Sequence, residues 1–300
     1  MKMVVIANPV AGRGRPFRKL QAHVRSWNHP DWNVELLPTQ APGHAGVLAR
    51  GLLARPPDIL AVCGGDGTVN EVVSVLPPKP PFPLAVLPGG TANVLARELG
   101  LPLDPVRALD VALAGKVRLV DVGEMQAKED RRFAFVFVAG IGFDAWAVHL
   151  ARPSIKAKIG IAAYALAVAE CLASYRFPRF EVVANGRIYA AISCLVCNAR
   201  SYGGGLSFCP DADMADGFLD VLVIKNEGNA GVVCRARLLG LLLSAWISPG
   251  RTPTWIERLR ARELRVEGPP SVLIETDGEL AGALPAKFLL AEKSLPLIAR

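Results

Sequence analysis

The chain has 300 residues, of which 51% are hydrophobic and 20% are charged. One hydrophobic core rarely organises so many residues, which predicts two domains, and the apolar content excludes an intrinsically disordered chain. The 34 basic and 27 acidic residues give a net charge of +7. Nucleic acid is not an expected partner, because no aromatic interleaving or known binding motif accompanies the arginines.

The first third of the chain alternates strand-like apolar runs with helical patterns. The expected strands are Met3–Ala7, Val34–Leu37, Asp58–Val62 and Leu84–Leu87. The expected helices are Phe17–Trp27, His44–Ala54, one from about Thr68, one that ends at Leu99, and Asp104–Ala114. Repeated β-loop-α units specify a parallel sheet covered by helices. We therefore expect a three-layer α/β domain over residues 1–118.

The pattern changes after Val117 to a series of strand-like runs. The expected strands are Arg132–Val138, Phe180–Ala184, Arg187–Cys197, Gly217–Ile224, Glu263–Glu267 and Val272–Thr276. Asn185-Gly186 is a strong signal for a two-residue hairpin. Helical patterns intervene only at Lys158–Tyr175 and Ala230–Trp246. The sequence therefore predicts a second, mostly antiparallel β domain over residues 119–285, with residues 286–300 able to return to the first domain.

No segment has the length of a membrane anchor or a signal peptide. The run Val4–Ala7 is too short for a signal peptide. The longest apolar stretches, Ile159–Ala173 and Leu238–Ile247, fall short of the ~20 residues that span a bilayer. The six cysteines lack a disulfide-framework spacing, and Cys194 and Cys197 would point to opposite faces of a strand, which disfavours a metal site. We expect a cytoplasmic protein with reduced thiols, soluble or peripherally associated with a membrane.

Positive charge gathers late in the chain, around the second apolar helix. The arginines concerned are Arg235, Arg237, Arg251, Arg258, Arg260, Arg262 and Arg265. A basic patch beside apolar helices suits an anionic membrane surface. The alternative is a solvated basic face, and the sequence leaves both interpretations open.

Three turns that follow expected strands are rich in glycine: Asn8–Gly12, Gly64–Thr68 and Gly89–Asn93. In a parallel sheet they emerge at the carboxyl ends of the strands, where ligands bind. Glycine lets the backbone approach a phosphate, and the following helix offers free amides and the positive end of its dipole. The turns therefore indicate a nucleotide site; the alternative is three tight structural turns. Neither a P-loop nor a dinucleotide-binding fingerprint is present.

Acidic residues supply the chemistry that a kinase would need. Asp66 stands among the glycines of the middle turn, where it would repel a nucleotide unless it holds Mg²⁺, water or a proton; the alternative is an Asp that caps its own turn. Asp277 and Glu279 flank Gly278, and a kinase that acts on an alcohol needs a carboxylate to accept the hydroxyl proton. Taken alone, the latter motif is ordinary hairpin chemistry.

A second acidic group surrounds Gly217 and consists of Asp211, Asp213, Asp216 and Asp220. Close-set aspartates in a loop suit a hard cation such as Mg²⁺, although the spacing is not that of an EF-hand. A solvated acidic loop is the alternative. The four histidines are scattered, and none is assigned a catalytic role.

These motifs together resemble the diacylglycerol kinase catalytic-domain family, in particular the soluble bacterial lipid kinases, with sphingosine kinases as more distant relatives. The resemblance runs over nearly the whole chain. The segments that carry it are Gly64–Val72, Leu87–Asn93, Asp121–Gly123 and Asp277–Glu279. It implies an ATP site in the first domain and a lipid site in the cleft towards the second, with ATP and Mg²⁺ as cofactors.

The resemblance also implies roles for particular residues. The nucleotide-binding positions would be Asn8, Pro9, Gly12, Arg13, Thr39, Gly65, Asp66, Gly67, Thr68, Asn70, Glu71, Gly90 and Thr91. Glu279, with Asp277 beside it, matches the proton acceptor, and Asp66 and Asp121 match carboxylates that organise water and Mg²⁺. Asp216, with the backbone carbonyls of Asp213 and Phe218, matches a structural Mg²⁺ site. The helices around Tyr164 and Leu241 would shelter acyl chains or simply be core.

The chain departs from the family pattern at two places, and one assignment stays undecided. Arg13 stands where some relatives carry lysine, and Val94 where some carry aspartate, so the carboxylate–metal network is not fully reproduced. The lysine of the second domain could be Lys156 or Lys158.

Several alternatives stay open at this point. NAD kinases share the Gly-Gly-Asp-Gly-Thr turn, but here Asn70-Glu71 follows it directly, which favours a lipid kinase. A nucleotide-sensing or lipid-carrying protein that lost catalysis is the non-enzymatic alternative, with Val94 as its best support. The acceptor lipid is undecided among diacylglycerol, phosphatidylglycerol and sphingoid bases. An open sheet edge would allow a homodimer.

Overall fold

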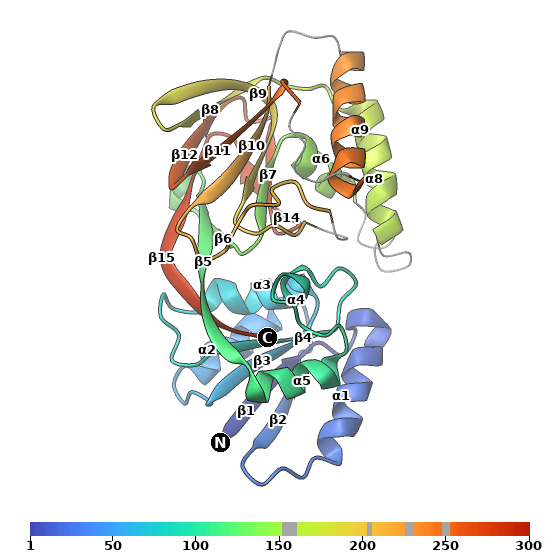
Figure 1. Cartoon of the computed structure of the whole chain (residues 1–300), viewed down its shortest axis with the longest axis vertical. Coiled ribbons are helices and arrows are strands. Elements are labelled where there is room, and N and C mark those ends of the chain that lie inside the picture. The colour runs from blue at the N-terminus through green and yellow to red at the C-terminus, as the bar shows by residue number, and fades with distance from the viewer. Residues whose placement is uncertain (152–160, 203–205, 226–230, 248–252) are drawn as a thin grey trace. The chain divides into compact units, whose positions relative to one another are not determined.

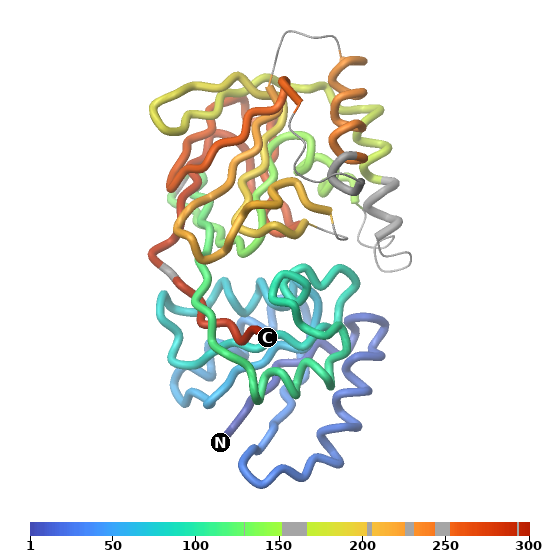
Figure 2. Tube along the Cα trace, viewed as in Figure 1, coloured from blue at the N-terminus to red at the C-terminus, as the bar shows by residue number. Residues whose placement is uncertain are grey.

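The computed structural model describes residues 1–151, 161–202, 206–225, 231–247 and 253–300 (Figure 1). The chain folds into two compact units: residues 1–121 with 292–300, and residues 122–291. The carboxyl-terminal residues thus belong to the first unit, and Leu297 pairs there with Leu84 (Figure 2).

The first unit is built on a parallel sheet in the order β2 (Asn33–Pro38), β1 (Lys2–Ala7), β3 (Ile59–Gly64), β4 (Leu84–Pro88) and the end of β15 (Ala286–Ala299). Its helices are α1 (Arg15–Arg25), α2 (His44–Leu52), α3 (Asp66–Val75), α4 (Val94–Glu98) and α5 (Pro105–Ala114). Helices cover both faces of the sheet, with α1 and α5 on one and α2 and α3 on the other (Figure 1). Every residue of β3 and β4 is accordingly buried, as expected for central parallel strands.

The second unit is a mostly antiparallel assembly in the order β14 (Glu279–Ala283), β13 (Leu273–Thr276), β7 (Val138–Ile141), β9 (Arg187–Cys197), β8 (Phe180–Ala184), β12 (Glu263–Glu267) and β15. β9 also pairs with β10 (Leu219–Lys225), which pairs with β11 (Ile256–Ala261), and β5 (Lys116–Gln126) pairs with β6 (Arg132–Phe135). Its helices are α6 (Phe143–Leu150), α8 (Ile161–Ser174) and α9 (Gly231–Ile247). The predicted fold class, a parallel α/β domain followed by an antiparallel β domain, is confirmed.

The local predictions differ from the structure in a few places. The single strand expected over Arg132–Val138 is two strands, because the carboxylate of Asp277 takes the backbone amides at 136–138 that a continuous ladder would use. Sequence patterns missed β5, α6, β11 and β14. The Asn185-Gly186 hairpin between β8 and β9 is confirmed, and both residues have positive φ angles, 51° and 73°.

The remaining global expectations concern membranes and thiols. Among the described residues, none of the helices has both the length and the apolar character needed to cross a bilayer. All six cysteines are free and buried, and their reduced state stays a prediction.

Candidate nucleotide site and acidic turn

The three glycine-rich turns leave neighbouring strands and lie against one another. The amide of Asn8, after β1, donates to the carbonyl of Cys63 in β3 at 2.8 Å, and the amide of Gly89, after β4, donates to the carbonyl of Gly64 at 2.8 Å. The side chain of Asn8 donates to the hydroxyl oxygen of Thr68 at 3.1 Å. The three turns therefore form one continuous backbone surface at the carboxyl edge of the sheet.

Glycine is required where these turns touch. A Cβ atom at Gly65 would lie 3.2 Å from Cα of Gly90, and one at Gly12 would lie 2.6 Å from the carbonyl oxygen of Gly89. Any side chain at either position would push the turns apart. The glycines that suggested a phosphate site are thus also required for the close contact between the turns.

The first turn has an unusual backbone. Gly12, Arg13 and Gly14 all have left-handed conformations, with φ of 55°, 59° and 72°. Glycine adopts this region freely, whereas a residue with a side chain is strained there by about 1–2 kcal/mol. Arg13 is exposed, so the strained residue is a cation presented to solvent beside the glycine turns. Stored strain of this kind is common at ligand sites.

The middle turn opens directly into α3. The helix begins at Asp66, two residues earlier than predicted. Its N-cap residue is Gly65, which has no side chain to bond the first amides of the helix. Gly67 is exposed, so the first turn of the helix offers amides and the positive end of the dipole to an anion. Thr68 is buried and holds Asn8, which makes its contribution to the site one of support.

The third turn is closed by Asn93, a residue that the sequence analysis did not assign to the site. Its Oδ1 accepts the amide of Gly90 at 2.8 Å, its Nδ2 donates to the carbonyl of Gly90 at 2.9 Å, and its φ is +48°. The signal was available, because asparagine is the residue that best tolerates a left-handed position after glycine. Thr91, between them, is exposed.

Asp66 links the second and third turns. One oxygen of its carboxylate accepts the amide of Leu95, in the first turn of α4, at 3.3 Å. The carboxylate is partly buried in the midst of the backbone surface described above. A carboxylate in that position fits a cation that accompanies phosphate groups. Val94 is 7% exposed and packs as an apolar helix residue, so it adds no carboxylate.

The other predicted site residues lie on or directly after β2, α3 and β5. Thr39 follows β2 and is 9% exposed, and its amide donates to the carbonyl of Ala7 at 2.8 Å. The carboxylate of Glu71 accepts the amide of Ala45 at 3.1 Å, which ties α2 to α3. Asn70 lies on α3 one position before Glu71, and Asp121 lies in β5 as the last residue of the first unit.

The predicted acids of the second unit form the turn between β13 and β14. Asp277 and Gly278 have φ of 50° and 86°, the geometry of a tight hairpin. The carboxylate of Asp277 accepts three backbone amides, from Val136 at 2.7 Å, Phe137 at 2.9 Å and Val138 at 3.1 Å. Glu279 begins β14 and is exposed. The two acids therefore have different surroundings: Asp277 anchors backbone, and Glu279 faces solvent.

The predicted structural metal site lies in the loop before β10. One carboxylate oxygen of Asp216 accepts the amide of Phe218 at 3.0 Å, and the other pairs with the guanidinium of Arg260. Arg260 also lies 4.6 Å from the ring of Phe218. A guanidinium on this carboxylate does not fit a cation at the same position. The described residues hold no group of three metal-ligating side chains, so Mg²⁺ at Asp213, Asp216 and Phe218 stays a prediction.

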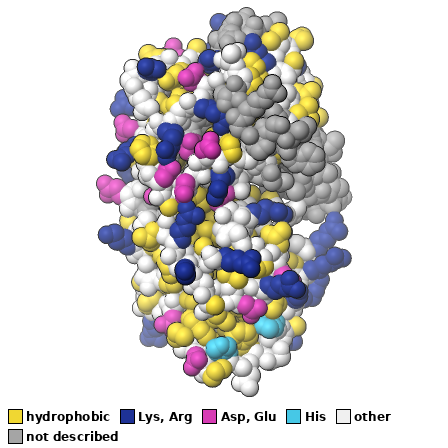
Figure 3. Space-filling model, in the orientation of Figure 1, with side chains coloured by type: hydrophobic (Ala, Val, Ile, Leu, Met, Phe, Trp, Pro, Cys, Tyr) yellow, Lys and Arg dark blue, Asp and Glu magenta, His cyan; other side chains and the backbone are white. Residues whose placement is uncertain are grey.

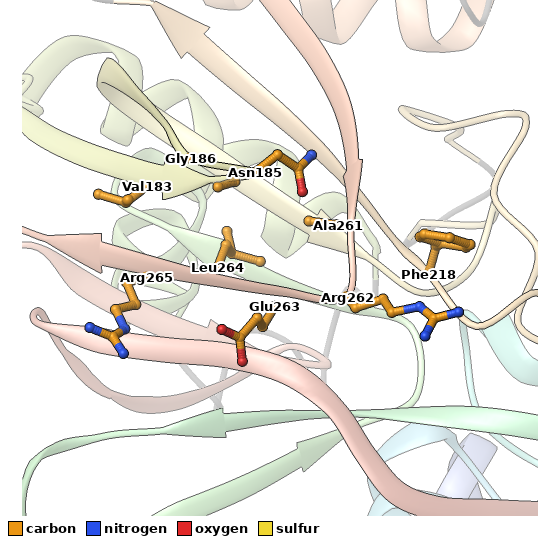
Figure 4. A pocket seen from close by; sticks show the side chains of 10 residues that line it. Val183, Asn185, Gly186, Phe218, Ala261, Arg262, Glu263, Leu264 and Arg265 are labelled. Carbon is orange, nitrogen blue, oxygen red and sulfur yellow. The ribbon is translucent and has the colours of Figure 1, made fainter.

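An open pocket of about 530 Å³ lies nearby, between the β8–β9 hairpin and the start of β12. Arg262 and Arg265 lie at its opposite ends, with Glu263 between them (Figure 4). The two guanidinium groups do not converge on one point, and Glu263 pairs with Lys287 at 2.7 Å. This pocket is therefore not a converged anion site.

Some arginines of the basic run predicted between residues 235 and 265 make hydrogen bonds or ion pairs within the protein. Arg235 donates to the carbonyls of Leu172, Ala173 and Tyr175 at the end of α8, and Arg260 pairs with Asp216. Lys and Arg side chains are spread over the visible face of the molecule (Figure 3). Two of the predicted arginines are therefore held by contacts within the second unit.

Some predicted residues give little or no structural information. Lys156 and Lys158 lie outside the described residues, and so does the side chain of Tyr164. Leu241 of α9 is 5% exposed, which places it in the interior of the second unit.

Comparison with known proteins gives two consistent matches along the chain. Residues 2–125 match the family model described as the diacylglycerol kinase catalytic domain, and residues 137–299 match the one described as the YegS C-terminal NAD kinase beta sandwich-like domain. A diacylglycerol kinase of Mycobacterium tuberculosis is 28% identical over 301 residues, covering 99% of this chain and 94% of that protein. One from Bacillus subtilis is 29% identical over 290 residues, covering 95% and 92%.

Solved structures share the fold. A diacylglycerol kinase from Bacillus anthracis has a TM-score of 0.72 at 23% identity, covering 100% of this chain and 97% of that one. A yeast NADH kinase complexed with NADH has a TM-score of 0.56 at 11% identity, with coverage of 100% and 84%. An NAD kinase from Archaeoglobus fulgidus in complex with ATP has 0.50 at 13%, with coverage of 99% and 93%. At these identities the likeness establishes the architecture alone.

Proposed function

The chain belongs to the diacylglycerol kinase catalytic-domain family, and we propose that it is an ATP-dependent kinase for the hydroxyl group of diacylglycerol or a related lipid. The observation that carries the proposal is the single surface formed by the turns after β1, β3 and β4. It brings together backbone amides, the start of α3 and the cation Arg13, which are the groups that bind a polyphosphate.

Each part of this surface has a task in phosphoryl transfer. The amides at the exposed Gly67 and Thr91 bind phosphate oxygens, and Arg13 neutralises the charge of the phosphates. Asp66 and Asp121 are the carboxylates that would hold Mg²⁺, which when bound supplies further neutralisation of the phosphate charge. Because the transition state has little covalent contribution from the protein, positioning and charge neutralisation account for most of the catalysis.

The proton of the lipid hydroxyl needs an acceptor, and we assign that task to Glu279. Its carboxylate is exposed, whereas that of Asp277 already accepts three amides. A carboxylate with three donors is held strongly as the anion and is a weak base. Asp277 thus keeps the turn in place, and Glu279 accepts the proton.

Labelled ATP with mixed lipid micelles tests the activity. Label in the organic phase supports a lipid kinase, label on NAD supports the alternative shared with NAD kinases, and ATP binding without transfer supports a non-catalytic protein. Glu279→Ala should lower turnover by about 10² to 10⁴, the usual contribution of a general base, and Asp66→Ala should remove most of it. Exposed acids on each unit, in Asp110→Asn and Glu267→Gln, serve as controls.

We also propose that the protein meets its lipid at a membrane surface through α9. Val232 is 75% exposed, Leu239 48% and Leu243 55%, and their spacing of seven and four residues places them on one face of the helix. An exposed apolar helix face of this kind inserts at the lipid interface. Co-sedimentation with anionic vesicles should fall in Leu239→Asp; unchanged binding would refute this surface.

Self-association through a sheet edge remains a prediction. β2 and β14 end the paired strand order and present the edges that a second copy would use. Light scattering over a range of protein concentrations gives the oligomeric state directly.

A further inference from the structure

Two carboxyl groups lie together behind the acidic turn, and no step of the proposed reaction uses them. Glu275, in β13, is 1% exposed and stands two residues before Asp277. Asp144 is on the first turn of α6. Gly140 of β7 pairs directly with Glu275, and a Cβ atom there would lie 2.6 Å from Oε1 of Glu275 and even closer to Oδ2 of Asp144. The glycine leaves the space in which the two carboxyl groups meet.

Each carboxyl group has an outer contact that helps to hold it. Oε2 of Glu275 accepts the amide of Gly278 at 2.6 Å, and Oδ1 of Asp144 accepts the hydroxyl of Tyr202. The inner oxygen of Glu275, Oε1, is buried, and no N–H or O–H group of the described residues donates to it. It faces the carboxyl of Asp144. Two ionised carboxylates have only acceptors to offer each other, so a stable contact between them needs a proton.

The surroundings of the pair also favour one bound proton. Burial, followed by the charge of Asp144 and the hydrogen bond with it, raises the pKa of Glu275 well above its usual value, and Asp277 adds to the effect. The amide of Gly278 acts in the opposite direction. A buried carboxyl beside a second acid behaves as a pair that loses its protons in separate steps.

The other titratable groups around the pair come from several elements. Cys171 of α8 and Tyr175, just after that helix, contact Phe143 at the start of α6, and Tyr202 contacts Asp144. Burial raises the pKa of Cys171 to about 12 and the pKa of Tyr175 above its usual value, so both groups are neutral. On the neighbouring elements, Arg132 of β6 pairs with Glu124 at 3.5 Å and His149 of α6 is exposed.

We propose that Glu275 and Asp144 share one proton and that the resulting pair holds the turn at Gly278, which makes Glu275 a positioning residue for Glu279. The turn is then held from both sides, by Glu275 on the amide of Gly278 and by Asp277 on the amides at 136–138. The role assigned to Glu279 rests on the proposed function, whereas the shared proton is a property of the ligand-free protein.

The shared proton is tested by the pH dependence of stability. A glutamate in the unfolded chain loses its proton near pH 4.3, whereas the folded pair keeps it, so the unfolded state binds fewer protons and stability falls as pH rises. Urea unfolding between pH 5 and 8 should show the folded-to-unfolded ratio of the wild type falling by up to about tenfold per pH unit relative to Glu275→Gln. The amide of glutamine can donate to Asp144 and accept from Gly278 but cannot titrate. Glu267→Gln, an exposed residue of β12, should follow the wild type.

The positioning role is tested by two further measurements. In Glu275→Ala the Gly278 amide should exchange with solvent at least about tenfold faster than in the wild type, because its acceptor is gone, and Glu275→Gln should restore slow exchange. In lipid phosphorylation, Glu275→Ala should lower kcat with KM for ATP unchanged, and Glu275→Gln should retain most of kcat.

The outcomes separate the two proposals. Equal pH dependence in the wild type and Glu275→Gln would show that the pair shares no proton, and unchanged Gly278 exchange in Glu275→Ala would refute the positioning role, whether or not the protein is a kinase. If Glu275→Ala does not fold, Asp144→Asn decides, because it removes the second acid and should weaken the pH dependence relative to the wild type, while burial continues to raise the pKa of Glu275; a pH dependence equal to that of the wild type would refute the shared proton. Absence of lipid phosphorylation with both stability results intact would refute the proposed function alone.

Discussion

Arg13 combines backbone strain with a predicted ligand contact, and two substitutions separate them. Arg13→Gly and Arg13→Ala both remove the guanidinium, but only glycine relieves the left-handed conformation, whose φ is 59°. Relief of this backbone strain stabilises the glycine variant by about 1–2 kcal/mol. The greater flexibility of glycine in the unfolded chain offsets about 0.5–1 kcal/mol of that gain. Arg13→Gly should therefore be about 1 kcal/mol more stable than Arg13→Ala, measured by urea unfolding without nucleotide.

The same pair should behave alike in nucleotide binding. An exposed charge-assisted contact with phosphate contributes about 1.4 kcal/mol, at the low end for hydrogen bonds to charged groups, which corresponds to roughly tenfold in Kd. Calorimetry with ATP should show that loss in both variants, and Arg13→Lys should recover part of it. Equal stability of the two variants would contradict the strained backbone, and unchanged Kd in both would contradict a phosphate contact by Arg13.

Three further predictions follow from single contacts. Asn93→Ala should lower stability by about 1–3 kcal/mol, because it breaks both bonds to Gly90 and keeps a left-handed backbone; Asn93→Gly, which avoids the strain, should lose less in the same unfolding assay. Arg260→Ala should make thermal stability depend on Mg²⁺, because it uncovers Asp216, whereas the wild type should respond equally to Mg²⁺ and to a chelator; a magnesium-dependent wild type would contradict the guanidinium at this site. Burial raises the pKa of Cys63 to about 12, so iodoacetamide at pH 8 should leave it unmodified until the protein is unfolded, and rapid modification of the native protein would contradict that burial.

The fold class could be predicted from the sequence because the patterns that specify it are local and repeated. Apolar runs followed by glycine and then by helical spacing specify parallel β-α units, and Asn185-Gly186 specifies its own hairpin. The break between β6 and β7 could not be predicted, because it depends on the carboxylate of Asp277, about 140 positions away in the chain. Short strands such as β11 and β14 owe their conformation to their neighbours in the sheet, which a single-sequence pattern does not contain.

The contact between the three glycine-rich turns could be predicted for a related reason. Gly12, Gly65 and Gly90 are needed both for close approach of the turns and for access to a phosphate, so one sequence feature reports two structural conditions. The role of Asn93 was visible in principle, since its bonds reach only three residues back. The sequence could not place Asp216 on Arg260, because that pair joins the loop before β10 to β11, and the two segments become neighbours only after folding.

The different surroundings of Asp277 and Glu279 could not be predicted from the Asp277-Gly278-Glu279 motif alone. Two acids on either side of one glycine look interchangeable in sequence, and either satisfies the requirement for a proton acceptor. In the structure, the carboxylate of Asp277 accepts three backbone amides, whereas Glu279 is exposed to solvent. The buried Glu275, two residues before Asp277, accepts the amide of Gly278. Basicity depends on those donors, not on residue type. The motif therefore identifies a turn that carries two acids, while the backbone amides at 136–138 decide which of the two carboxylates is available to accept a proton.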